Sequence, residues 1–313
     1  MSRLQASIIV LVVSGLAACS TTFEKLAMTV SALEEAKVSD QLEPSESYNI
    51  GRAASAVIVD SQPMANFSDE ATADRIVYLN LIGGYVEATS KRVTRSSGEL
   101  GSFVERSYDQ QERVDESVLY KGVQIGLLAD EDVAAYGTPG GFIWITQGAL
   151  DLCRNEDEVA ALISIQLAHI VLEHPLTCYR LEDEGRILEP TGDHAAWFAG
   201  NGLGANFGRL VVTLADAISY EYYETPYNLE AESYATLALL QAGYEPRAVV
   251  SVLTAMSLER QQTQQDWLKR QSDLDARVAS AAQFIADHEM QVHPSWKTGA
   301  PARQQRFNEV MAK

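Results

Sequence analysis

Apolar residues recur at helical spacing along much of the chain, while two short stretches have the composition of β-strands. The helical pattern covers residues 69–87 and 231–242, and residues 23–33 show a shorter amphipathic version of it. Residues 123–128 and 142–146 are rich in β-branched and aromatic side chains, which favours strands. The pattern therefore predicts an α+β fold that is rich in helices and contains a small β-sheet.

Residues 156–174 are predicted to form one helix that is apolar on almost every side and is therefore buried. Gln166, His169 and Glu173 lie at i, i+3 and i+7, so they share one stripe of this helix. A polar stripe in a core is either satisfied by hydrogen bonds or part of a functional site, and the pattern leaves both open. His169 and His174 are five residues apart, about 140° around a helix, so we expect that they do not face one metal ion.

The N-terminus resembles a bacterial lipoprotein signal. Arg3 precedes a short apolar stretch at 6–18, and the stretch ends in Leu16-Ala17-Ala18-Cys19, which is similar to a lipobox. The resemblance implies that Cys19 is acylated and becomes the mature N-terminus, and Ser20 beside it implies the outer membrane, facing the periplasm. An ordinary cleaved signal with an incidental cysteine is the alternative.

The predicted domain organisation follows from this signal and from the positions of the helices. Residues 1–18 are the signal peptide, 19–44 a lipid-anchored tether, 45–285 the main domain and 286–313 a C-terminal helical extension. The polar residues 89–117 are predicted to form a loop or a hairpin.

Charge and cysteine content narrow the class of protein. The chain has 43 acidic and 24 basic residues, a net charge of −19, which disfavours a nucleic-acid partner because phosphates need a basic surface. Three cysteines are too few for a disulfide framework. Cys153 and Cys178 flank the predicted buried helix, roughly 27 Å long, so no bridge between them is expected.

Four segments follow one another in an order typical of one enzyme family. They are 132–150, which contains Pro139-Gly140-Gly141; 155–162, which reads N-E-D-E-V-A-A-L; 165–174; and 228–246, which ends in A-G-Y-E-P. Together they resemble the HtpX-like zinc metallopeptidases, metallopeptidase family 48, which includes the CAAX prenyl proteases. The resemblance covers about residues 45–280. It implies a gluzincin-like domain whose small sheet or hairpin lies beside the helix that carries the active site.

The departures from this family fall on its chemistry. The family's H-E-x-x-H motif is replaced by Ile165-Gln166-Leu167-Ala168-His169, and Asn228 stands where the family has its third zinc ligand. Isoleucine cannot bind zinc, and an amide oxygen is a poor ligand beside imidazole or carboxylate. Gln166, at the position of the general base, cannot accept a proton. The resemblance with these changes predicts a catalytically degenerate member that needs no cofactor.

Two further positions are interpreted through the same resemblance. Glu232 stands where the family has an aspartate that orients a ligand histidine, so we expect a hydrogen bond between His169 and Glu232. The family's His-Pro pair near the C-terminal helices corresponds to Gln271-Ser272, and His293-Pro294 is a weaker candidate.

The family's hairpin presents an edge strand to which extended peptides add. The corresponding residues here are Gly140, Gly141, Phe142, Ile143 and Trp144. A buried strand under the helix is the alternative interpretation of these residues. The sequence thus predicts an envelope lipoprotein pseudoenzyme, chaperone-like or scaffolding, with unfolded or partner polypeptides as partners. An active zinc metalloendopeptidase with atypical ligands, working in envelope protein quality control, and a purely structural lipoprotein are the alternatives.

Overall fold

The computed structural model describes the chain in five long stretches and in single residues between them. The stretches are 44–90, 119–176, 225–263, 273–288 and 295–313, and the single residues lie between 211 and 223 and between 265 and 271. The predicted signal peptide, Cys19, the tether up to residue 43 and the predicted loop at 91–117 lie outside the described residues. Cys153 is a free, buried thiol, and Cys178 also lies outside the described residues.

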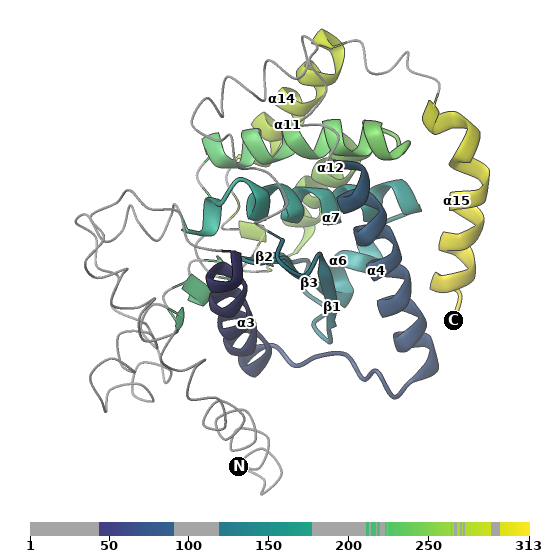
Figure 1. The fold of residues 1–313 in the computed structure, drawn as a ribbon. Helices are drawn as coiled ribbons and strands as arrows, with labels where there is room; N and C mark the ends of the chain where they lie inside the picture. Colours follow the sequence, from purple (N-terminus) through teal and green to yellow (C-terminus); the bar gives the residue numbers. More distant parts are fainter. Residues whose placement is uncertain are drawn as a thin grey trace, which may run out of the picture.

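Three short strands form a mixed sheet in the order β1-β3-β2. β1 (Gln124–Leu128) pairs in parallel with β3 (Phe142–Thr146), and β2 (Ala135–Thr138) pairs with β3 in the antiparallel sense. Helices surround the sheet (Figure 1), so the predicted α+β fold with a small sheet is confirmed. The apolar pattern did not mark β2, because this strand has only four residues, one of them glycine.

β3 is the central strand of this sheet, with β1 on one side and β2 on the other. The backbone hydrogen-bonding groups of Phe142, Ile143 and Trp144 therefore face neighbouring strands of the same sheet. The prediction that these residues present an edge strand is wrong, because a central strand leaves no backbone groups free for an added peptide. The edges of the sheet are β1 and β2.

The sheet lies between two helices (Figure 1). On one face, Ile143 and Ile145 belong to the main hydrophobic core together with the residues of α7 (Glu156–Val171). On the other face, Tyr136 packs in a second cluster with Ile50 and Ala54 of α3 (Pro44–Ser61). Alternate residues of a strand point to opposite faces, so each strand contributes to both clusters.

α7 forms the centre of the molecule, and nearly all of its residues are buried. The side chain of Asn155 caps its N-terminus by accepting a hydrogen bond from the Glu158 N–H, and three acidic residues lie in its first turn. α4 (Glu70–Ser90), α11 (Thr225–Ala242) and α12 (Ala248–Gln262) pack around it. The helix is shorter than predicted, because it ends at Val171 and Glu173 adopts a positive φ of 53°.

The last two helices complete the fold around α7. α14 (Leu274–Asp287), capped by the Asp273 side chain, packs against α11 and α12. α15 (Ser295–Met311) contacts α4 and α7, and Arg306 on it donates hydrogen bonds to the buried carboxylate of Glu156. Tyr78 and Tyr244 donate to the same carboxylate, so that Glu156 links α7 to α4, to α15 and to the residues that follow α11.

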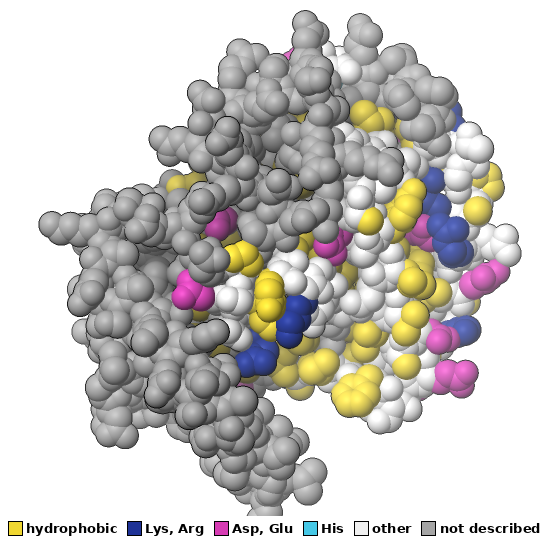
Figure 2. Space-filling model, viewed as in Figure 1, with side chains coloured by type: hydrophobic (Ala, Val, Ile, Leu, Met, Phe, Trp, Pro, Cys, Tyr) yellow, Lys and Arg dark blue, Asp and Glu magenta, His cyan; other side chains and the backbone are white. Residues whose placement is uncertain are grey.

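The outer face of α4 is apolar as well as its inner face. Val77, Leu81 and Tyr85 lie one turn apart on it and are exposed. Figure 2 shows hydrophobic side chains on the surface in the region where Figure 1 places α4. This explains why the helix is not amphipathic in sequence. Within the part of the chain that the structure describes, no helix combines the length and the apolar composition needed to cross a membrane.

Candidate functional site

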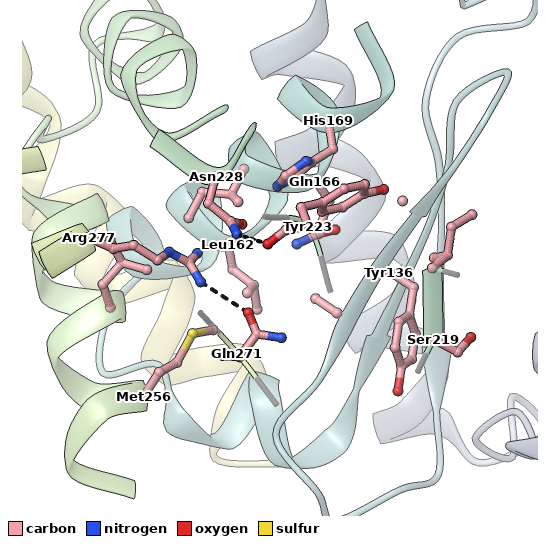
Figure 3. A pocket seen from close by; sticks show the side chains of 15 residues that line it. Tyr136, Leu162, Gln166, His169, Ser219, Tyr223, Asn228, Met256, Gln271 and Arg277 are labelled. Carbon is pink, nitrogen blue, oxygen red and sulfur yellow. Dashed lines mark hydrogen bonds between the residues drawn. The ribbon is translucent and has the colours of Figure 1, made fainter. Parts of the chain in front are cut away.

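A hollow of about 590 Å³, including the part open to solvent, lies where α7, α11, α14 and β2 approach one another. Several positions that the sequence singled out line it: Ile165, Gln166, His169, Asn228 and Gln271. Figure 3 shows the polar side chains of this set around one common space. Residues up to 106 positions apart in the chain thus meet at one site. The apolar pattern within each segment gives no indication that these residues lie close together.

α7 presents three neighbouring positions of its helical face to the hollow, namely Ile165, Gln166 and His169. β2 lies so close to this face that a Cβ atom added to Gly137 would stand 2.9 Å from the carbonyl oxygen of Gln166. Glycine at position 137 therefore permits the close approach of the strand to the helix. The Gln166 side chain is only 8% exposed. Its amide makes no hydrogen bond to any residue that the structure describes.

His169 and His174 contact one another directly. Their Nδ1 atoms are 2.9 Å apart, and His174 Nε2 lies 3.3 Å from Glu230 Oε2. The ring of His169 also stacks on Tyr223 at a centroid distance of 3.9 Å. The angle of about 140° expected between the two histidines does not apply, because α7 ends at Val171 and Glu173 adopts a positive φ, so the two rings contact one another.

Burial lowers the pKa of His169 well below its ordinary value, and the neighbouring His174 and the Arg277 cation act in the same direction. The folded protein therefore holds this imidazole neutral where the unfolded chain would bind a proton. Stability rises with pH wherever the unfolded state binds more protons, so this group lowers stability only below its unfolded pKa.

We expect the free energy of unfolding to fall by up to about 1.4 kcal/mol per pH unit, owing to His169 alone, as the pH drops below about 6.5. Urea unfolding at pH 7.5, 6.5 and 5.5 measures this slope, and His169→Asn should reduce it because it removes the titrating group. His288→Gln, at a partly buried histidine outside the hollow, is the matched control and should leave the slope unchanged. Equal slopes in the protein and in His169→Asn would contradict the assignment.

Glu232 pairs with an arginine rather than with His169. Its Oε1 atom accepts a hydrogen bond from Arg277 Nε at 2.6 Å and lies 2.5 Å from Arg277 Nη2. The expected hydrogen bond between His169 and Glu232 is therefore wrong. α14 places Arg277 beside α11, and its guanidinium pairs with Oε1 of the carboxylate that was expected to orient the histidine. Glu232 Oε2 is buried and has no hydrogen-bond partner among the described residues. Burial raises the pKa of Glu232, and Arg277 opposes this shift.

Arg277 is a charged residue of the site that the sequence did not indicate. It is buried, it lines the hollow, and its Nη1 donates to Gln271 Oε1 at 3.0 Å. The only signal for it was its place in the segment that follows Gln271-Ser272, where an arginine lies among polar residues. Nothing in that pattern distinguishes a buried arginine from an exposed one.

Asn228 has a structural contact of its own. Its Nδ2 donates a hydrogen bond of 2.6 Å to the carbonyl oxygen of Tyr223, which lies before the start of α11. The side chain is buried and lines the hollow beside His169. At this position the amide therefore helps to hold the chain that enters α11.

The donor atoms at this site do not fit the zinc ion that the resemblance implies. Tetrahedral zinc needs three or four ligands from histidine, cysteine, aspartate or glutamate. Of the three expected positions only His169 carries such a group, because Ile165 is apolar and Asn228 is an amide. Among the described residues, no set of three or more potential ligands of these types lies close enough to hold a metal ion.

Comparison with known proteins agrees with the family resemblance of the segments that form the hollow. The family model of peptidase family M48 matches residues 98–311, about two thirds of the chain. None of the curated proteins matches the chain.

Proposed function

Because the chain belongs to peptidase family M48, we propose that it is a pseudoenzyme that binds polypeptides in the family's cleft without hydrolysing them. The observation that carries this proposal is the lining of the hollow, where Ile165, Gln166 and Asn228 replace two zinc ligands and the general base. Loss of a general base alone typically costs about 10²–10⁴-fold in rate. Three changes at one site would remove the chemistry, while the chain keeps a hollow at this position.

The free edge of β2, which no described strand pairs with although the four residues of β2 are buried, supports the binding of an extended chain. The carbonyl of Ala134 accepts a hydrogen bond from the Thr146 N–H on the β3 side, so the backbone groups of the alternate residues Ala135 and Gly137 point away from β3. In the described part of the chain, no strand pairs with β2 on that side. Ala135 and Gly137 line the hollow, so a peptide added there would lie along α7.

Unfolded or partner polypeptides are the ligands we propose, because pairing with a strand edge depends on main-chain groups that every polypeptide has. The protein would then act in a chaperone-like or scaffolding role. We further propose that acylation of Cys19 anchors it to the outer membrane, facing the periplasm. The lipobox-like sequence at 16–19 supports this location.

One observation favours a second function, an active metalloendopeptidase with atypical ligands. The Nδ1 atoms of His169 and His174 are 2.9 Å apart, and Glu230 lies beside His174, so two imidazoles and a carboxylate form a continuous chain. In this chain the groups contact one another in series and do not converge on one point. For this reason we prefer the pseudoenzyme.

Elemental analysis and peptide binding test the proposal together. The protein, purified without a histidine tag, is expected to contain close to zero zinc per chain. It is also expected to bind an extended, fluorescein-labelled hexapeptide with the same affinity in the presence and absence of EDTA. A zinc content near one that His169→Ala abolishes would contradict the pseudoenzyme and support the alternative.

Methylated peptides test whether the strand edge is used, and they leave the protein itself unchanged. Only alternate N–H groups of an added strand face its neighbour. A peptide methylated at every second backbone nitrogen should therefore still bind, in the register that turns its unmodified N–H groups toward β2. Methylation of every nitrogen should reduce the affinity by about tenfold or more. Equal binding of the unmodified and the fully methylated peptide would show that the edge of β2 plays no part.

A further inference from the structure

The lining of the hollow combines apolar residues with several hydrogen-bond donors and, among the described residues, contains no acidic side chain. Arg277 is the one charged residue among the described lining residues, and Gln166, Asn228 and Gln271 contribute three carboxamides. This is unusual for a chain with a net charge of −19. A carboxylate at position 166 or 228 would make the site attractive to cations. The amides found there remove that negative charge.

Two of the carboxamides have donors available to a ligand. Gln271 Oε1 accepts from Arg277, so its amide nitrogen is the free end of the side chain, and in Figure 3 it points into the hollow. The Gln166 amide is more than nine-tenths buried and has no hydrogen-bond partner among the described residues. Because Gln166 lines the hollow, a bound group of the right polarity would accept the hydrogen bonds that no described residue accepts from this amide.

Arg277 adds charged donors to the same space. A guanidinium has five N–H groups, and the contacts of Arg277 with Glu232 and Gln271 involve one from each nitrogen. Two N–H groups therefore remain for a ligand. Glu232, which holds the guanidinium in place, is not part of the lining of the hollow. The planar fork of arginine matches a carboxylate better than it matches a single oxygen.

We propose that this hollow binds a carboxylate, and that its ligand is the free C-terminal end of a polypeptide chain. This inference rests on the proposed function, because a chain that adds to β2 brings its end to the hollow that Ala135, Tyr136 and Gly137 also line. Such ends are made when another peptidase hydrolyses a peptide bond. The protein would therefore bind products of proteolysis in preference to internal segments of intact chains.

Two hexapeptides of identical sequence test the proposal, one with a free C-terminal carboxylate and one with a C-terminal amide. Both carry fluorescein at the N-terminus, and their affinities are measured by anisotropy in EDTA. We expect the carboxylate form to bind about tenfold more tightly or better, because charge-assisted hydrogen bonds replace neutral ones. Equal binding would overturn the carboxylate site and leave the proposed function standing. Absence of binding by either peptide would overturn the proposed function itself.

Variants of single glutamines locate the site within the protein. Gln166→Glu places a negative charge in the hollow and is expected to reduce the ratio of the two affinities to about one. Gln262→Glu adds the same charge at an exposed position of α12 and should keep the ratio. Should Gln166→Glu fail to fold, Gln166→Met, which removes the donor without adding charge, is expected to lower the ratio severalfold. An unchanged ratio in a folded Gln166 variant would refute the site.

Discussion

Replacing Arg277 by leucine is expected to lower the free energy of unfolding by about 3–5 kcal/mol. The side chains of Arg277 and Glu232 are 4% and 1% exposed, so the substitution leaves a carboxylate buried without its counter-charge. Burial already raises the pKa of Glu232 in the presence of the arginine, and without Arg277 the carboxyl would be forced further toward its protonated form. Gln271 would also lose the donor to its Oε1.

Urea unfolding at pH 7 measures this loss, and two further variants show its origin. Arg52→Leu changes an exposed arginine on α3 and should alter the stability by less than about 0.5 kcal/mol. The double variant Arg277→Met with Glu232→Leu removes both charges and should recover most of the loss, since a buried pair is often replaceable by apolar residues of similar size. A cost for Arg277→Leu as small as that for Arg52→Leu would mean that the pair does not stabilise the fold.

The second large effect is expected from restoring ligands at the site. Ile165→His combined with Asn228→Glu would place three zinc-binding side chains around the hollow, because positions 165 and 228 line it together with His169. We expect the zinc content to rise from near zero to about one per chain. The contact between the Nδ1 atoms of His169 and His174 leaves Nε2 of His169 available as a ligand.

Gln166→Glu is the matched single variant for this experiment. It restores the residue at the general-base position without adding a ligand of the family's set, so its zinc content should stay near zero. Equilibrium dialysis against a defined concentration of zinc, followed by elemental analysis, gives the stoichiometry of each variant. If the double variant also stays near zero, the walls of the hollow have moved away from the geometry that zinc requires.

The secondary structure was largely accessible from the sequence, because it depends on neighbouring residues. The largely apolar run within residues 156–174 is a local signal, and it corresponds to α7 as the structure has it. The resemblance to the peptidase family also indicated that Gln166, His169 and Asn228 belong to one site, and the structure brings them to one hollow. Their chemical roles remain part of the proposal.

Predictions failed where they depended on knowing at which residue a helix ends or in which order the strands lie in the sheet. On an ideal helix the side chains of His169 and His174 would point in different directions. The positive φ of Glu173 interrupts the helical backbone between them, so this angle no longer applies. The strand at 142–146 was recognised from the sequence. Its central position in the sheet results from pairing with both β1 and β2, which lie at different separations from it along the chain. A pattern of single residues does not contain this information.

Most helices and strands of this protein, and its departures from the family's motif at positions 165, 166 and 228, can be read from the sequence, since both depend on residue type and local spacing. Which groups pair with one another at the site depends on the tertiary structure. Arg277 reaches Glu232 across 45 residues because α11 and α14 pack together, and His174 turns back onto His169 because α7 stops at Val171. Such pairs follow from the relative placement of whole elements, which long-range packing selects and local periodicity does not specify.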